Sequence, residues 1–198
     1  TGPVPARPAL RALAGAIAHL EAHATAAGDV PAAATVDPPL SEGEALALTE
    51  LATRLARLAA GVDLAGGESS VVRRLPVAVE SLRRATDALG ARALTAADAD
   101  QSWRADGQRS FTSWLAATTG IHRGRAGREI RRAHALRDDL PTFRALLARG
   151  ELGADHVDAV VREAMTSQDR LAALRDPDYG EHALAGAAAD ATASEFTR

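Results

Sequence analysis

The sequence predicts an all-α protein. Hydrophobic residues make up 46% of its 198 residues, mostly Ala, Leu and Val, whereas aromatic residues make up only 3%. Ala and Leu are strong helix formers, and the aromatic side chains that favour strands are scarce. Apolar residues also recur at spacings of three and four, the period of a helix that packs on one side. We therefore expect an antiparallel helical bundle followed by a multi-helix region that contains a helix-turn-helix-like unit.

Residues 1–100 are expected to form the heptad-patterned bundle. Its first helix covers residues 9–27, and its second begins at Ser41, which has the capping-box spacing to Glu44. The third helix repeats an inward seam over three heptads. Pro76 lies inside that run, so the helix is expected either to begin or to bend there. The predicted seam of this third helix consists of Val72, Leu75, Val79, Leu82, Thr86, Leu89 and Ala93.

The second region, residues 101–198, contains a local concentration of positive charge; as an alternative, the two regions form one continuous domain. Between Gln101 and Arg137 only Asp106 and Glu129 oppose eight arginines, so this window carries +6 in a chain of net charge −3. A basic segment in an acidic chain suggests a polyanionic partner, most often nucleic acid. The eight residues are Arg104, Arg109, Arg123, Arg125, Arg128, Arg131, Arg132 and Arg137.

These arginines lie mostly on one predicted helix. A short apolar helix with Phe111 and Trp114 ends at Gly120, and an arginine-rich helix follows after a three-residue turn. This order is the outline of a helix-turn-helix. A bundle helix with a solvated arginine face fits the same pattern, with Glu129 paired to Arg125 or Arg132. On the first interpretation, the predicted nucleic-acid contacts are Arg109, His122, Arg123, Arg125, Arg128, Arg131 and Arg132, with His122, Arg123 and Arg128 as candidates for base edges.

The rest of the chain predicts short helices. One covers residues 142–149, started by Pro141 and capped by Gly150, the next covers residues 154–165, and others begin near Ser167, at Glu181 and after Thr192. Pro is favoured in the first turn of a helix, and Gly is favoured just after its end.

No group of residues predicts catalysis. The chain has no Cys, which excludes disulfides and thiolate metal sites. His19 and His23 are four residues apart but have no third ligand nearby, and neither His134 with Asp138 nor Asp155 and His156 with Asp158 matches a known ligand set. We expect no metal or cofactor in this chain, no membrane span and a cytoplasmic location. Whether the parent protein is an enzyme stays open.

A combined string of residues resembles a known family. SxxxWLA and TGI (Ser110 to Ile121) precede the arginine-rich helix ending in AHAL, which is followed by LP and by ALLARGELGADHV, up to Val157. The chain ends in TASEFTR. This order resembles the domain of unknown function 222, also called the thirteen-E-twelve repeat family of actinobacterial proteins. Gly153 stands where the family tends to place a Ser or similar capping residue.

The resemblance implies a DNA-associated N-terminal helical domain, which in that family typically precedes a C-terminal HNH nuclease domain with a divalent metal. The chain has no Asn and no Cys, so the HNH motif is absent from it, and the metal is expected only in that missing domain. Two alternatives remain. One is a non-enzymatic DNA-binding regulator or mobile-element accessory protein. The other is a helical protein-interaction module that forms homo-oligomers through its heptad helices.

Overall fold

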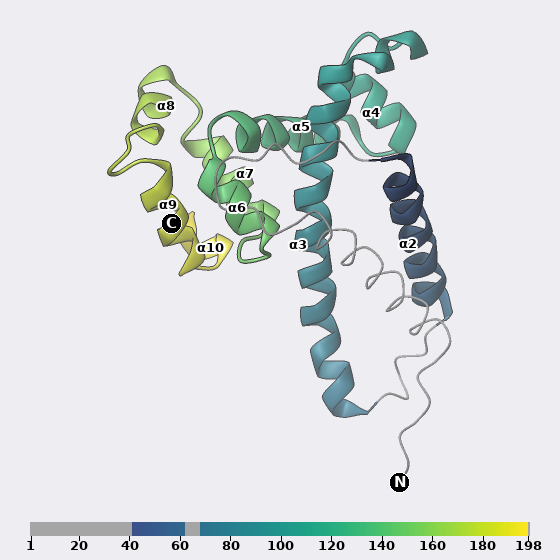
Figure 1. The fold of residues 1–198 in the computed structure, drawn as a ribbon. Helices are drawn as coiled ribbons and strands as arrows, with labels where there is room; N and C mark the ends of the chain where they lie inside the picture. Colours follow the sequence, from purple (N-terminus) through teal and green to yellow (C-terminus); the bar gives the residue numbers. More distant parts are fainter. Residues whose placement is uncertain (1–40, 62–67, 198) are drawn as a thin grey trace. The chain divides into compact units, whose positions relative to one another are not determined.

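Residues 41–61 and 68–197 are described by the computed structural model, and within these ranges the chain forms helices joined by turns, without a β-strand. The prediction of an all-α protein is thus confirmed (Figure 1). The chain divides into two units, residues 1–68 and residues 69–198, which are described separately. The helix predicted over residues 9–27, with its two histidines, lies outside the described residues. The bundle predicted for residues 1–100 therefore stays a prediction.

In the first unit, helix α2 (Glu42–Gly61) begins with the predicted capping box. The backbone N–H of Ser41 donates to Glu44 Oε2 at 2.7 Å, and the backbone N–H of Glu44 donates to Ser41 Oγ at 3.3 Å. Glu42 adds a second negative charge in the first turn, where it stabilises the positive end of the helix dipole.

The second unit is built around helix α3 (Ser69–Asp100). Pro76 lies inside this helix, so the prediction that the helix could begin there was wrong. Pro76 has no N–H to donate to the preceding turn, but the residues from Ser69 to Leu75 still complete the helix before it. The helix also continues to Asp100.

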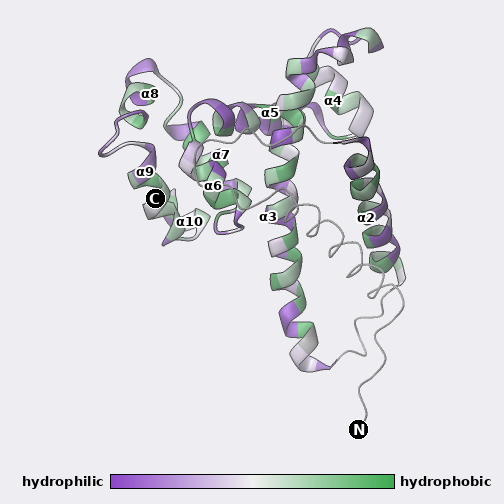
Figure 2. Cartoon of the chain, in the orientation of Figure 1, coloured by the Kyte–Doolittle hydropathy of each residue, from purple (hydrophilic) through white to green (hydrophobic). Residues whose placement is uncertain are grey.

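Within this unit α3 does not use its predicted seam. Ala91 is buried and Leu94 is half-buried in the core, whereas Val79, Leu82 and Leu89 keep 58%, 40% and 41% of their surface exposed. At about 100° per residue, Ala91 lies on the side of the helix opposite to the seam. Figure 2 shows apolar and polar residues alternating along this helix. The helix therefore has two apolar faces, and the face with the smaller side chains packs against helices α5 (Arg123–Asp138) and α6 (Pro141–Ala148).

A small aromatic core lies where α3 leads into the 3₁₀ helix η1 (Ser102–Asp106) and helix α4 (Phe111–Thr119). The ring of Phe111 stacks on Trp114, with centroids 5.3 Å apart, and lies 5.7 Å from the ring of Trp103. Trp114 Nε1 donates to Asp106 Oδ2 at 2.8 Å, so its one polar atom is satisfied.

A larger aliphatic core fills the rest of the unit. Its largest fully buried side chains are Leu140, Phe143, Leu147, Leu152 and Val157, each with essentially no exposed surface. Most of them lie on short helices that cannot be stable alone, so packing holds these helices in place. The elements after α4 are α5 (Arg123–Asp138), α6 (Pro141–Ala148), α7 (Ala154–Glu163), α8 (Gln168–Leu174), α9 (Glu181–Ala189) and α10 (Ala193–Phe196).

Two buried polar side chains connect these helices through hydrogen bonds. Glu181 Oε1 accepts a hydrogen bond from the backbone N–H of Phe143 at 2.8 Å, in the first turn of α6. The ring of His156 accepts from Gly153 N through Nδ1 and donates through Nε2 to the carbonyl of Ala191 at 3.1 Å. Both ring nitrogens of His156 are thus used inside the fold, which gives this residue a structural role.

No helix in the described ranges is both long enough and apolar enough to span a bilayer.

Candidate nucleic-acid interface

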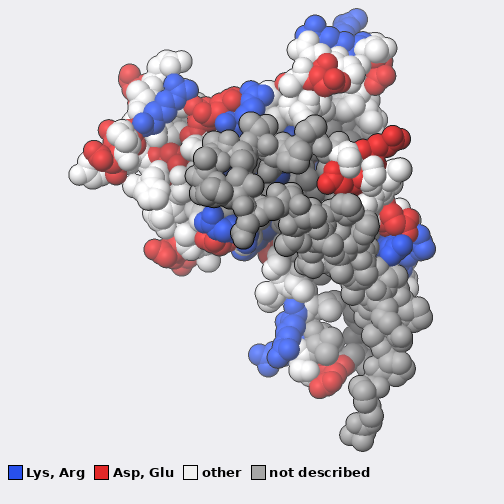
Figure 3. Space-filling model, in the orientation of Figure 1, with Lys and Arg blue, Asp and Glu red and all other residues white. Residues whose placement is uncertain are grey.

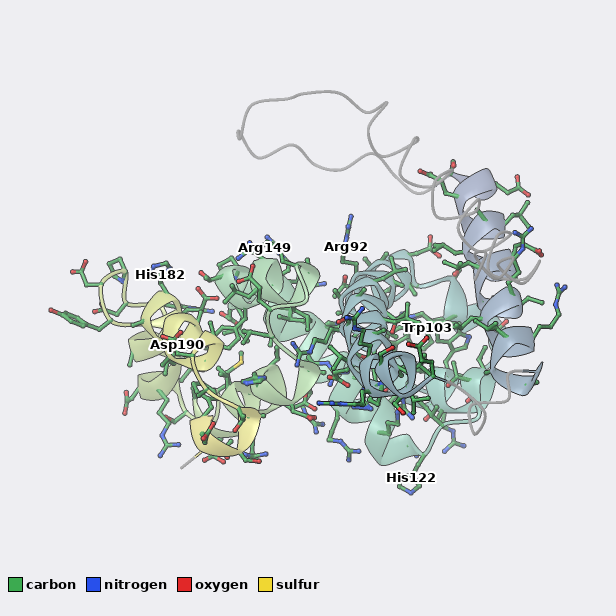
Figure 4. All side chains as sticks on the ribbon, turned by 90° about the horizontal axis from the view of Figure 1, so that it is seen from below. Arg92, Trp103, His122, Arg149, His182 and Asp190 are labelled. Atoms are coloured by element: carbon green, nitrogen blue, oxygen red, sulfur yellow. The ribbon has the colours of Figure 1, made fainter. Side chains whose placement is uncertain are left out.

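The arginine-rich helix α5 begins where the sequence predicts it. Gly120 ends α4 in the left-handed conformation, with φ of 72°, and α5 starts three residues later at Arg123. His122 caps α5, because its Nδ1 accepts the backbone N–H of Gly124 at 3.1 Å. A neutral His122 ring therefore carries its proton on Nε2. Figure 4 shows this side chain pointing away from the body of the molecule.

Helix α5 is fixed by both cores of the unit. Ala126 and Ile130 belong to the aromatic core, while Ala133 and Leu136 belong to the aliphatic one. Figure 1 shows α5 crossing α3 near the end of α3 that leads into η1. A helix held by two cores cannot rotate about its axis without exposing apolar side chains, so its arginine face has a fixed direction.

Three arginines of α5 form ion pairs with carboxylates. Arg125 Nε donates to Glu129 Oε1 at 2.7 Å, one of the two pairings expected from the sequence, and this hydrogen bond raises the pKa of Arg125. Arg137 Nε donates to Asp138 Oδ1 at 2.6 Å, which lowers the pKa of Asp138. At least one side chain of each pair is well exposed, so both pairs contribute little to stability.

The third, Arg132, is paired across the fold. Its Nη1 lies 3.1 and 3.0 Å from the two carboxylate oxygens of Asp158 on α7, and the two side chains are 11% and 29% exposed. On the α3 side, burial raises the pKa of Asp87, while the positive charge of Arg132 acts in the opposite direction. Arg132 thus connects α5 to α7 and helps neutralise a half-buried acid of α3.

Three arginines of α5 have no ion-pair partner among the described residues: Arg123, Arg128 and Arg131. All three are exposed, and no carboxylate among the described residues lies within ion-pairing distance of them. At about 100° per residue they cover an arc of roughly 140° on α5. His122 adjoins them at the start of the helix. We call Arg123, Arg128 and Arg131 the open arginines.

A groove of about 900 Å³ runs beside the open arginines, between α5, α7 and α10. Arg128 and Arg131 line one side of it, and Arg162 of α7 lines another. Carboxylates line it too, among them Asp155 and Asp158. Figure 3 likewise shows positive and negative side chains interspersed on the face in view. The lining of the groove is therefore of mixed charge, and its positive side chains come from α5 and α7.

Acidic residues of this region are engaged by basic neighbours. His134 Nε2 lies 3.1 Å from Asp98 Oδ2, close enough for an ion pair, although the contact lacks the direction of a hydrogen bond. Asp138 is engaged by Arg137. In the described part of the chain, no group of three or more His, Asp or Glu side chains could hold a metal ion.

Of the seven predicted contact residues, the structure brings four together: His122, Arg123, Arg128 and Arg131. Arg125 and Arg132 lie on the same helix but are engaged by Glu129 and Asp158. Arg109 is exposed and precedes α4, at the end of that helix away from the turn. The length of α4 places it roughly 13 Å from the start of α5 along the α4 axis.

Sequence reasoning did not assign a role in this surface to the glycines of α5. A Cβ built on Gly124 would lie 4.0 Å from Arg128 Nη1, and one on Gly127 would lie 3.5 Å from Arg131 Nη1. Each open arginine in the middle of the helix thus folds back over a glycine four residues earlier. The repeated Gly-to-Arg spacing of four in the sequence is the signal that could have indicated it.

One family model matches this sequence. It is described as "Domain of unknown function (DUF222)", and it covers residues 73–197, from α3 to α10. No curated protein and no solved structure matches the chain.

Proposed function

The chain belongs to the DUF222 family, whose description gives no function, and we propose that residues 69–197 bind DNA through the open arginines of α5. One observation carries the proposal. Arg123, Arg128 and Arg131 are exposed together on a helix that two cores hold in place, and no described carboxylate lies within ion-pairing distance of them. In an acidic chain, exposed cations that stay unpaired are free to bind phosphates.

The open arginines would act by positioning. Guanidinium groups donate in a planar fork that matches phosphate oxygens, so each can hold one phosphate of the DNA backbone. The N-terminal end of α5, with His122 and Arg123, also carries the positive end of the helix dipole. Base-edge contacts from His122 Nε2, Arg123 or Arg128 would supply any sequence preference.

The fuller role is that of a DNA-associated domain of an HNH-endonuclease-like protein. In such a protein the HNH domain would cut DNA with its divalent metal, and the helical unit would place that domain on its substrate. This assignment of cleavage to the HNH domain agrees with the contacts of the helical unit. In that unit His134 and Asp138 are held in ion pairs and His156 has a structural role, so all three side chains are engaged in the fold.

Duplex binding by the unchanged protein tests the proposal. We expect a fluorescein-labelled duplex to bind with an affinity that falls as salt rises. The slope of log K against log [salt] should be about −3 or steeper, because each neutralised phosphate contributes roughly −0.9. Fluorescence anisotropy across a salt series measures both quantities. No binding at low salt, by protein that circular dichroism shows to be folded, would refute the DNA-binding function.

The second face of α3 favours a second candidate function, self-association. Val79, Leu82 and Leu89 lie on the α3 face opposite to its core face and are exposed. Apolar residues in heptad spacing pair readily with a second helix of the same kind. On this hypothesis the unit is an oligomerisation module that pairs α3 with α3 of a second copy.

Leu82→Asp is expected to abolish dimers in sedimentation velocity if this second candidate is right, because it places a charge in the middle of the paired face. Val77→Asp is the matched control: Val77 is 69% exposed and lies on the other side of α3, so this change should leave the oligomeric state unaltered. A wild-type protein that sediments as a monomer at about 100 µM would exclude self-association as the function.

A further inference from the structure

Gly127 occupies the middle of the open-arginine surface. Viewed down the axis of α5 it lies between Arg123 and Arg131, about 40° from each, with Arg128 farther round the same side. It is half-buried, and α5 continues for eleven residues beyond it, to Asp138. Glycine destabilises a helix interior more than any residue except proline, so a glycine here needs a reason.

The fold itself does not supply that reason. Gly127 is not among the residues of positive φ, so its backbone conformation suits any residue. A Cβ at this position would meet Arg131 Nη1 at 3.5 Å and Thr112 Cγ2 at 3.8 Å, which are ordinary van der Waals distances. Alanine would therefore fit in the free protein. Gly124 differs, because a Cβ there would lie only 3.2 Å from His122 Nδ1, against the cap of the helix.

A remaining physical reason for a glycine is the close approach of another molecule to the helix backbone. The arginines around Gly127 indicate what that molecule is. The guanidinium group of Arg131 lies over the position, Arg123 and Arg128 are near it on the helix surface, and phosphate is the anion that such groups bind in a nucleic acid. Arg131, whose guanidinium lies over Gly127 in the free protein, has a long flexible side chain that can move to the side of an incoming phosphate.

We propose that Gly127 is the point at which the DNA phosphate backbone comes closest to α5, and that its lack of a side chain sets this distance. The inference rests on the proposed DNA-binding function. It adds that the interface depends on a residue with no charge and no hydrogen-bonding side chain. A methyl group at position 127 would hold the phosphate away from the guanidinium groups and from the helix backbone.

Gly127→Ala and Gly127→Gln test the inference, because both replacements are good helix formers and differ in size. We expect each to raise the melting temperature by about 2–4 °C. We expect Gly127→Ala to weaken duplex binding about tenfold, the equivalent of one lost charge-assisted contact. Gly127→Gln should weaken it further. A gain in stability with a loss of affinity is a combination that a purely structural glycine cannot produce.

Gly186→Ala is the matched control. Gly186 is an exposed residue inside α9, and a Cβ added to it would meet no atom within 4 Å, so its replacement should raise the melting temperature equally and leave binding unchanged. If both Gly127 variants bind the duplex as tightly as wild type, while substitution of the open arginines abolishes binding, the inference is wrong and the proposed function stands. If wild type does not bind the duplex, both are wrong.

Discussion

An Arg132→Ala variant is expected to lose about 2–4 kcal/mol of unfolding free energy, because breaking a partly buried ion pair leaves the other charge without compensation. The remaining charge is Asp158, which is 29% exposed, so partial solvation keeps the loss toward the lower end of that range. Asp87 would also lose the positive charge that offsets its burial. Urea denaturation followed by circular dichroism measures the change.

Duplex binding separates this structural role from a direct contact. Below the unfolding transition, the folded Arg132→Ala protein should bind with a salt slope close to that of wild type. In a double-mutant cycle with Asp158→Ala, we expect the combined loss of stability to be smaller than the sum of the single losses, since the two residues share one interaction. Unchanged stability together with a shallower salt slope would instead assign Arg132 to the DNA, as the sequence predicts.

Local signals in the sequence predict the helix ends well. The capping box of Ser41, the left-handed Gly120 and the N-terminal Pro141 each act through atoms within four residues of themselves. Thr192 is another example, because its hydroxyl accepts the backbone N–H of Glu195. Such interactions do not depend on the rest of the fold, so the residue types and their spacing are sufficient to identify them.

The face by which α3 packs could not be predicted in the same way. A ranking by hydrophobicity directs Leu82 and Leu89 inward, yet Ala91 takes the buried position. Small side chains let neighbouring helices approach closely, and this benefit depends on the shapes of α5 and α6. The pattern alone shows two apolar faces on α3. It does not show which face a given neighbour covers.

The sequence predicts which helix carries the candidate site. It does not predict which arginines of that helix form ion pairs. The spacing of the arginines places Arg125, Arg128, Arg131 and Arg132 on one arc of α5, and it equally predicts the pairing of Glu129 with Arg125 or Arg132. It cannot predict that Arg132 meets Asp158, which lies 26 residues away. Long-range pairs of this kind form only when α7 packs against α5, so they decide which arginines stay open.

Replacing Arg123, Arg128 and Arg131 together with alanine is expected to weaken duplex binding by about 100- to 1,000-fold at low salt, since each lost phosphate contact accounts for roughly tenfold. The slope of log K against log [salt] should become shallower by about 2.7. Fluorescence anisotropy across the salt series used for wild type measures both changes.

The same triple variant should be as stable as wild type. Arg123 is the first residue of α5, where a positive charge opposes the helix dipole, and alanine is the better helix former at all three positions. None of the three is paired with a carboxylate of the described residues, so their removal leaves no charge uncompensated. A loss of affinity could then not be attributed to unfolding.

A control of equal charge decides whether the location of the arginines matters. Arg73, Arg74 and Arg144 are exposed residues of α3 and α6, and none of them forms an ion pair with a carboxylate in the part of the chain that the structure describes. Replacing these three with alanine takes the net charge from −3 to −6, as does replacing the open arginines. If binding depended only on overall charge, the two triple variants would be equally weak.

We expect the control to stay within about threefold of wild type, because exposed charges farther than about 10 Å from a phosphate are largely screened. A control as weak as the α5 variant would contradict a site on α5 and leave only a diffuse attraction.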